Sequence, residues 1–131
     1  MKHRIWGCSI LALLAVLVLA PAQVVGQDEA VLEVVAVDTH GKTAEYIASL
    51  EPLLKRLKEV APKTETKIYE ADLSGEFTGT VYVTIRYPNM EYMAQNRAKA
   101  FSDPQFTEAL QAVAATGRTI ISRSLLVDRT P

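Results

Sequence analysis

A strand with two chemically different faces stands in the middle of the sequence, in the segment TVYVTIRY that ends just before Pro88. Side chains of a β-strand point alternately to its two faces, so this segment sorts into two sets. The apolar set is Val81, Val83, Ile85 and Tyr87. The polar set is Thr80, Tyr82, Thr84 and Arg86. We expect the apolar face to meet helices and the polar face to line a cleft.

The first half of the chain predicts a strand, a helix and a second strand. Residues 30–38 are rich in valine at successive positions, as in a strand that is covered on both faces. Residues 43–60 predict a helix, with a kink or a restart near Pro52, because proline lacks the N–H that an interior helical position donates. The apolar face of this helix is expected to hold Ile47, Leu50, Leu54 and Leu57. Residues 66–74 predict the second strand, and the glycine-bounded residues 75–79 predict a hairpin loop.

The second half predicts a helical region in two parts and a last strand. Asn89 can cap the first part, and Asp103 can cap the second, with Pro104 at the first helical position, where its missing N–H costs nothing. The inward stripe of the first part is expected to hold Met90, Met93, Ala94, Arg97, Ala98 and Phe101. Asn96 is expected to face solvent. Residues 119–128 predict the last strand.

This order of elements is βαββαβ, the arrangement of the split βαβ unit. We therefore predict an α+β, ferredoxin-like fold, with a four-stranded antiparallel sheet and helices on one face. The first and last strands carry apolar residues on both faces, so the face away from the helices also needs a cover. A second copy of the chain is the simplest cover, because a twofold dimer buries the same patch on both subunits.

The first 26 residues have the layout of a secretory signal peptide. Lys2 and Arg4 precede an apolar run over residues 5–20, and small residues follow. The run is shorter than the roughly 20 apolar residues that span a bilayer, so we expect cleavage rather than an uncleaved anchor. Cleavage is expected near Gly26, with a second plausible point after Ala22. The protein is thus predicted to be exported, either periplasmic or secreted.

The remaining residues, 27–131, are expected to form a single domain with no cysteine, because Cys8 lies in the predicted signal peptide. The core alone must therefore hold an exported domain that has no disulfide. The formal net charge of −1 becomes more negative once Lys2 and Arg4 are removed, and no basic cluster stands out. This argues against a nucleic-acid partner and against membrane binding after signal cleavage.

Residues 75–131 combine a glycine-bounded hairpin, a strand that ends in Tyr87-Pro88, an Asp103-Pro104 cap and a last strand with the pattern GR…S.SLL. With these features the chain resembles the dimeric α/β-barrel superfamily, which includes antibiotic-biosynthesis monooxygenase-like domains. More closely, it resembles uncharacterised exported bacterial proteins. The resemblance implies a homodimeric barrel with the helices outside and the other sheet face lining the interior. It carries over no catalytic motif, because this fold hosts oxygenases, haem enzymes, isomerases and proteins of no known activity.

The polar set provides the first candidate site residues. Arg86 could pair with a substrate carboxylate or enolate through its planar fork of donors, and Tyr82 could donate a proton or a hydrogen bond. The structural alternative is that Arg86 pairs with Glu33 or another acid and that Tyr82 only packs, since buried charges are usually paired. Tyr69, Tyr82, Thr84, Arg86 and Arg123 are the ligand-binding candidates. Arg123 is either an edge charge or a second cation beside Arg86.

His40 and Asp72 complete the catalytic candidates, with Tyr82 and Arg86. His40 is the only histidine outside the predicted signal peptide, on a loop after the first strand, where it is either a general base or an exposed turn residue. Asp72 is either a base or a turn former. A lone histidine without a cluster of ligands predicts no metal site, and no second feature supports a haem. We therefore expect no cofactor.

Two functions remain open. The first is a small-ligand-binding or structural module, a homodimer that holds a small apolar or acidic ligand. The second is a cofactor-independent enzyme of the monooxygenase or isomerase type that uses the barrel cavity. The sequence favours the first, because no acid–base pair stands at a readable spacing.

Overall fold

The computed structural model describes residues 28–72 and 75–131, and the predicted signal peptide lies outside them. The strands are β1 (Val31–Asp38), β2 (Glu65–Glu70), β3 (Val81–Tyr87) and β4 (Thr119–Val127). They form one antiparallel sheet in the order β2-β3-β1-β4, which is the ferredoxin-like order. The helices are α2 (Thr43–Val60), α3 (Met90–Ser102) and α4 (Pro104–Ala114), with a 3₁₀ turn η2 (Gly75–Phe77) between β2 and β3. The predicted α+β fold is confirmed.

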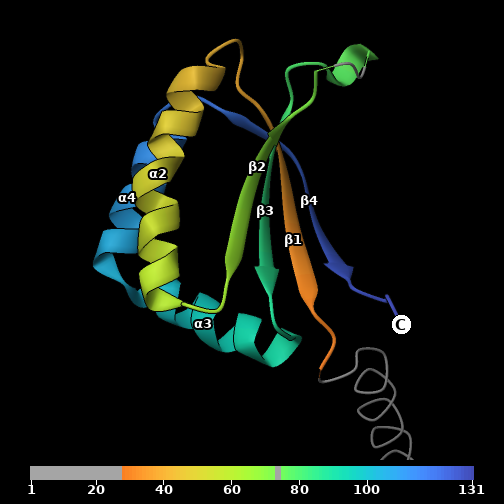
Figure 1. Ribbon diagram of the computed structural model, residues 1–131. Helices are drawn as coiled ribbons and strands as arrows, with labels where there is room; N and C mark the ends of the chain where they lie inside the picture. Colours follow the sequence, from red (N-terminus) through yellow and green to blue (C-terminus); the bar gives the residue numbers. More distant parts are fainter. Residues whose placement is uncertain (1–27, 73–74) are drawn as a thin grey trace, which may run out of the picture.

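The three α-helices lie on one side of the sheet (Figure 1), and the core lies between the two layers. Val81, Val83 and Tyr87 are buried there, as the alternation of the central strand predicts. Tyr82, Thr84 and Arg86 are half-buried or exposed on the opposite face. Within β3 both faces are therefore assigned correctly from the sequence, whereas Thr80, predicted on the polar face, precedes the strand and is buried.

The long helix α2 differs from its prediction in two ways. It continues through Pro52 without a restart, because Pro52 lies on the exposed side, where water can satisfy the carbonyl that the proline leaves free. Its buried residues are Tyr46, Leu50, Leu53 and Leu57. Ile47 and Leu54 are only partly buried. The buried stripe is thus centred closer to Tyr46 than predicted, because a tyrosine ring reaches further into the core than its hydropathy suggests.

Helix α3 crosses one end of the sheet, near the end of β3 (Figure 1), and its predicted inward stripe is wrong in phase. The buried residues are Met93, Asn96 and Ala100, whereas Ala94 and Ala98 are exposed. Asn96 is satisfied in the core because its Nδ2 donates to the carbonyl of Tyr92 at 2.8 Å. The predicted cap is confirmed, since the Asn89 side chain accepts from the amide of Tyr92 at 2.7 Å.

Asp103 joins all three helices. It ends α3 and caps α4, and its Oδ1 accepts from the amide of Phe106 at 2.8 Å. Arg56 of α2 donates to the same carboxylate twice, from Nε at 3.0 Å and from Nη2 at 2.6 Å. The Arg56 and Phe106 hydrogen bonds lower the pKa of Asp103 to about 2. The sequence predicts the cap, whereas the link to α2 appears only in the fold.

The second strand is shorter than predicted, so Asp72 lies in the connection after β2 and not within it. β4 carries an irregularity, because its pairing with β1 shifts by one residue between Ala36 and Val37. Within residues 28–72 and 75–131, none of the helices combines the length and the apolar character needed to cross a bilayer.

The Asp103 junction predicts a pH dependence of stability. The folded-state pKa lies below the ordinary value of 3.8, so the charged carboxylate stabilises the protein above about pH 4, and this contribution is lost as the pH falls toward about 2. Asp103→Asn keeps a capping oxygen but has no charge. We expect this variant to be less stable than the parent protein at pH 6, and the difference in free energy of unfolding to shrink steadily down to pH 2. Urea denaturation across this range measures the difference, and a difference that does not change with pH would contradict the assignment.

Candidate functional site

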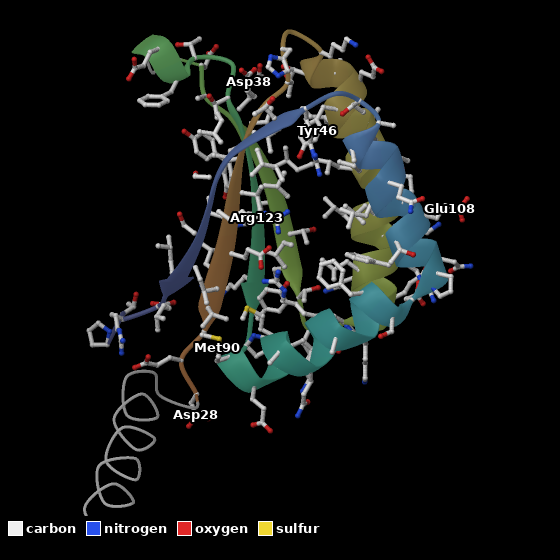
Figure 2. The ribbon with its side chains drawn as sticks, turned by 180° about the vertical axis from the view of Figure 1, so that it is seen from behind. Asp28, Asp38, Tyr46, Met90, Glu108 and Arg123 are labelled. Atoms are coloured by element: carbon white, nitrogen blue, oxygen red, sulfur yellow. The ribbon has the colours of Figure 1, made fainter. Side chains whose placement is uncertain are left out.

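A cavity of about 180 Å³ lies between the sheet and the helices. Most of its lining is aliphatic or aromatic, from α2, α4 and the inner faces of β1 and β3, and includes Leu50, Leu53, Val83, Ile85, Phe106 and Val113. Charged and hydroxyl groups enter it from both layers. Figure 2 shows Arg123 on the sheet side and Tyr46 on the helix side of this space. The cavity is therefore apolar with a few convergent polar groups, as small-molecule sites commonly are.

An ion pair closes one part of the cavity lining. Glu33 of β1 points to the helix side, and its Oε2 lies 2.6 Å from Nη1 of Arg97 on α3. The Glu33 side chain is only 12% exposed and that of Arg97 is 37% exposed. The Arg97 guanidinium also lies 5.9 Å from the ring centroid of Phe101. This pair ties α3 to the centre of the sheet and places a carboxylate inside an otherwise apolar layer.

Two further guanidinium groups, those of Arg118 and Arg123, line the cavity near Tyr46. Burial raises the pKa of the Tyr46 hydroxyl, and Arg118, through its charge and a hydrogen bond, and Arg123, through its charge, partly offset that rise. Within the described ranges neither arginine forms an ion pair with a carboxylate. The cavity thus has an excess of positive charge beside a neutral phenol that can donate a hydrogen bond.

Tyr87 adds a second protonated phenol to the cavity lining. Burial and, to a smaller extent, the nearby Glu33 charge together raise the pKa of Tyr87 to about 12, with the charge of Arg97 partly opposing them. At neutral pH both phenols are therefore hydrogen-bond donors. The arrangement can hold an apolar molecule that carries an anionic or electron-rich group.

Four of the ligand candidates, Tyr69, Tyr82, Thr84 and Arg86, lie on the outer face of the sheet. Tyr69 of β2 pairs directly with Tyr82 of β3, and Tyr69, Thr84 and Arg86 line a shallow hollow of about 200 Å³. Nη2 of Arg86 lies 3.0 Å from Oδ2 of Asp128. The prediction that Arg86 pairs with Glu33 is wrong, because Glu33 points to the opposite face of the sheet. An acid does pair with Arg86, so this hollow has less free positive charge than the inner cavity.

The other candidates lie elsewhere. Arg123 is not beside Arg86, because it pairs in the sheet with Val35 and points to the helix side. His40 lies on the exposed loop after β1, and Asp72 is exposed after β2. In the described residues no hydrogen bond joins His40 or Asp72 to Tyr82 or Arg86. The structure therefore does not assemble these four residues into one site.

Sequence reasoning missed Tyr46, Arg97 and Arg118 as cavity residues. One signal was present, because Glu33 is a lone charge on the face of β1 that otherwise holds Val31 and Val35. A carboxylate on a helix-covered face requires a cationic partner from the covering helices. That requirement points to α3 and α2 but does not identify Arg97.

Comparisons with known proteins agree with this fold. No family model matches the chain, and no curated protein matches its sequence. A nipsnap family protein of unknown function from Agrobacterium tumefaciens superposes with a TM-score of 0.61 at 10% identity, over 79% of this chain and 89% of that one. A proposed antibiotic biosynthesis monooxygenase from Caulobacter crescentus gives a TM-score of 0.52 at 15% identity, over 80% and 93%.

SnoaB, a cofactor-independent oxygenase from Streptomyces nogalater, gives a TM-score of 0.53 at 16% identity, over 79% of this chain and 96% of that one. These structures share the fold of this chain over about four fifths of its length, which confirms the predicted ferredoxin-like arrangement of strands and helices. At such identities the likeness concerns the fold, and the chemistry must be argued from the cavity itself.

The Glu33–Arg97 pair predicts a measurable coupling. We expect Glu33→Gln and Arg97→Gln each to destabilise the protein, and the double variant to lose less than the sum of the two. Because one partner is largely shielded and the other is one-third exposed, the coupling energy should be about 1 kcal/mol. A double-mutant cycle by urea denaturation measures it, and additive losses would show that the pair does not hold α3.

Proposed function

We propose that this protein is an exported homodimer that binds a small amphipathic anion in the cavity between its sheet and helices. One observation carries the ligand class: an apolar cavity in which the guanidinium groups of Arg118 and Arg123 lie near Tyr46 without a carboxylate partner. Arg118 is half-buried and Arg123 is more exposed, so both guanidinium groups are accessible to a ligand, and an anionic group between them would gain charge-assisted hydrogen bonds.

The size of the cavity limits the ligand. A cavity of about 150 Å³ can hold one benzene ring, so about 180 Å³ suits a single ring or a short branched chain. The acidic group of the ligand would face Arg118 and Arg123, and its apolar part would contact Leu50, Leu53 and Phe106. Tyr46 would donate to the same acidic group.

A cofactor-independent monooxygenase is the second candidate. The structural likeness to SnoaB favours it, because a protein of this fold is described as an oxygenase of that type. Such an enzyme needs a base that generates a substrate anion. Glu33 is the carboxylate among the described cavity residues, and it is held by Arg97. Binding of a ligand that is already anionic therefore fits the cavity better than its generation from a neutral substrate.

The outer face of the sheet supports the homodimer. Leu32, Val34 and Ala36 of β1 lie there in register with Arg86, Thr84 and Tyr82. Leu126 of β4 pairs with Leu32 on the same face and is 51% exposed. Ala36 is buried and Leu32 and Val34 are half-buried, so the apolar surface of this face is open at Leu126 and in part at Leu32 and Val34. Apolar surface of this kind is typical of a face that packs against another chain. The amino-terminal pattern of residues 1–26 supports export.

The ligand proposal predicts a charge-dependent thermal shift. At a concentration of 100 times its dissociation constant, 4-methylbenzoate should stabilise the purified protein by about 2.7 kcal/mol. The neutral 4-methylbenzamide should shift the melting temperature far less. Arg118→Gln and Arg123→Gln should each weaken binding about tenfold, because each removes a charge-assisted hydrogen bond or charge contact.

Arg86→Gln is the matched control, because it removes a guanidinium from the same sheet on the opposite face. Loss of binding in Arg86→Gln with unchanged binding in Arg123→Gln would overturn the inner site and favour the outer hollow. Consumption of oxygen with a bound electron-rich phenol, lost in Arg123→Gln, would favour the monooxygenase.

The homodimer predicts a doubled mass in sedimentation-equilibrium centrifugation. Leu126→Asp should give a folded monomer, because a buried charge would be placed on both sides of the interface. Leu125→Asp is the matched control on the same strand and the other face. A monomeric parent protein, or equal effects of the two variants, would contradict the assigned interface.

A further inference from the structure

Three side chains that the ligand cavity does not use meet at one end of the sheet. Asp38 ends β1, Thr119 begins β4, and the two residues pair directly in the sheet. His40 lies two residues after Asp38 and reaches back over both. Its Nε2 is 2.8 Å from Oγ1 of Thr119, and its Nδ1 is 3.5 Å from Oδ2 of Asp38. The His40 imidazole therefore lies between the Thr119 hydroxyl and the Asp38 carboxylate.

The Asp38 carboxylate favours one direction of the hydrogen bond between His40 and Thr119. An ionised carboxylate beside Nδ1 favours the tautomer with its proton on that nitrogen. In that tautomer Nε2 has a free lone pair and would accept from the Thr119 hydroxyl, 2.8 Å away. The distance of 2.8 Å lies in the range expected for a nucleophile and its general base.

The backbone holds His40 in this position. Its φ angle is +53°, in the left-handed region that non-glycine residues rarely adopt. The other oxygen of Asp38, Oδ1, accepts from the amide of His40 at 2.8 Å and fixes this turn. Asp38 thus positions both the backbone and the ring of the histidine. Unusual backbone conformations of this kind concentrate at functional sites.

We propose that Thr119 is a nucleophilic hydroxyl, with His40 as its general base, that accepts acyl groups from activated esters. The Thr119 oxygen attacks the ester carbonyl carbon, and its proton passes to Nε2 of His40. The bond from carbon to the leaving-group oxygen breaks, and His40 returns the proton to that oxygen. Water then attacks the acyl-threonine with His40 again as base, which releases the acid and restores the hydroxyl.

The ester would reach Thr119 from a neighbouring cleft, whose lining includes Asp38 but neither His40 nor Thr119. The cleft has a volume of about 550 Å³ and is bounded by η2, the start of α2 and β4. Phe77 and Ile121 line it and are each half-exposed, which suits a short apolar acyl group or an aromatic leaving group. This cleft is separate from the ligand cavity, so the two proposals can fail independently.

Reaction with p-nitrophenyl acetate tests the proposal. We expect release of p-nitrophenolate and an acetyl group on Thr119, located by peptide mass mapping. His40→Gln should slow acetyl transfer to Thr119 about 100-fold, the typical contribution of a general base. Thr119→Ser should retain the reaction, and Thr119→Val should abolish the labelled peptide.

Two controls separate chemistry from folding. Thr107→Val removes a hydroxyl on α4 that has no histidine beside it, and it should leave the rate unchanged. Asp38→Asn keeps an oxygen for the His40 amide, so it should preserve the melting temperature and yet slow the reaction. Absence of both acetyl-Thr119 and His40-dependent p-nitrophenolate release would overturn the proposal, as would equal labelling in the parent protein and His40→Gln.

Discussion

The carboxylate of Asp103 is the interaction on which the helix layer depends. It closes α3, opens α4 and binds Arg56 of α2, so one charged group fixes three helices relative to each other. The sheet needs no such device, because its strands are aligned by main-chain hydrogen bonds. The inner cavity lies in the space between this self-aligned sheet and the helix layer. Its shape therefore depends on a contact outside its own lining.

The sequence predicts what short-range periodicity controls. The faces of β3, the two helix caps at Asn89 and Asp103 and the order of elements follow from alternation and from local hydrogen bonding, and each is confirmed. The phase of α3 does not follow, because it is set by tertiary contacts, the packing of Met93 on Val31 and Tyr87 and the reach of Arg97 to Glu33. A flexible side chain of that length can find partners in many directions. Tertiary structure decides between them.

The candidate sites show the same division. Two residues of the outer hollow share a predictable face, since Thr84 and Arg86 alternate along one strand. The inner cavity joins Tyr46 to Arg118 and Arg123, which are more than 70 positions away in the chain. No spacing rule connects them. The fold itself is shared with structures that are 10–16% identical, so it constrains the position of such residues without determining which of them are present.

The one-residue shift between Ala36 and Val37 in the pairing of β1 with β4 has a wider consequence. With an unbroken register Asp38 would pair with Ile120, and the Thr119 side chain would point to the other face of the sheet. The Thr119 hydroxyl and the His40 imidazole meet because β4 has one extra residue at the shift. The presence of a threonine and a histidine in the sequence would not be enough. Relatives should therefore be aligned on this strand by backbone register. An alignment scored on residue identity alone would match the aspartate, histidine and threonine even in proteins where their side chains point to different faces.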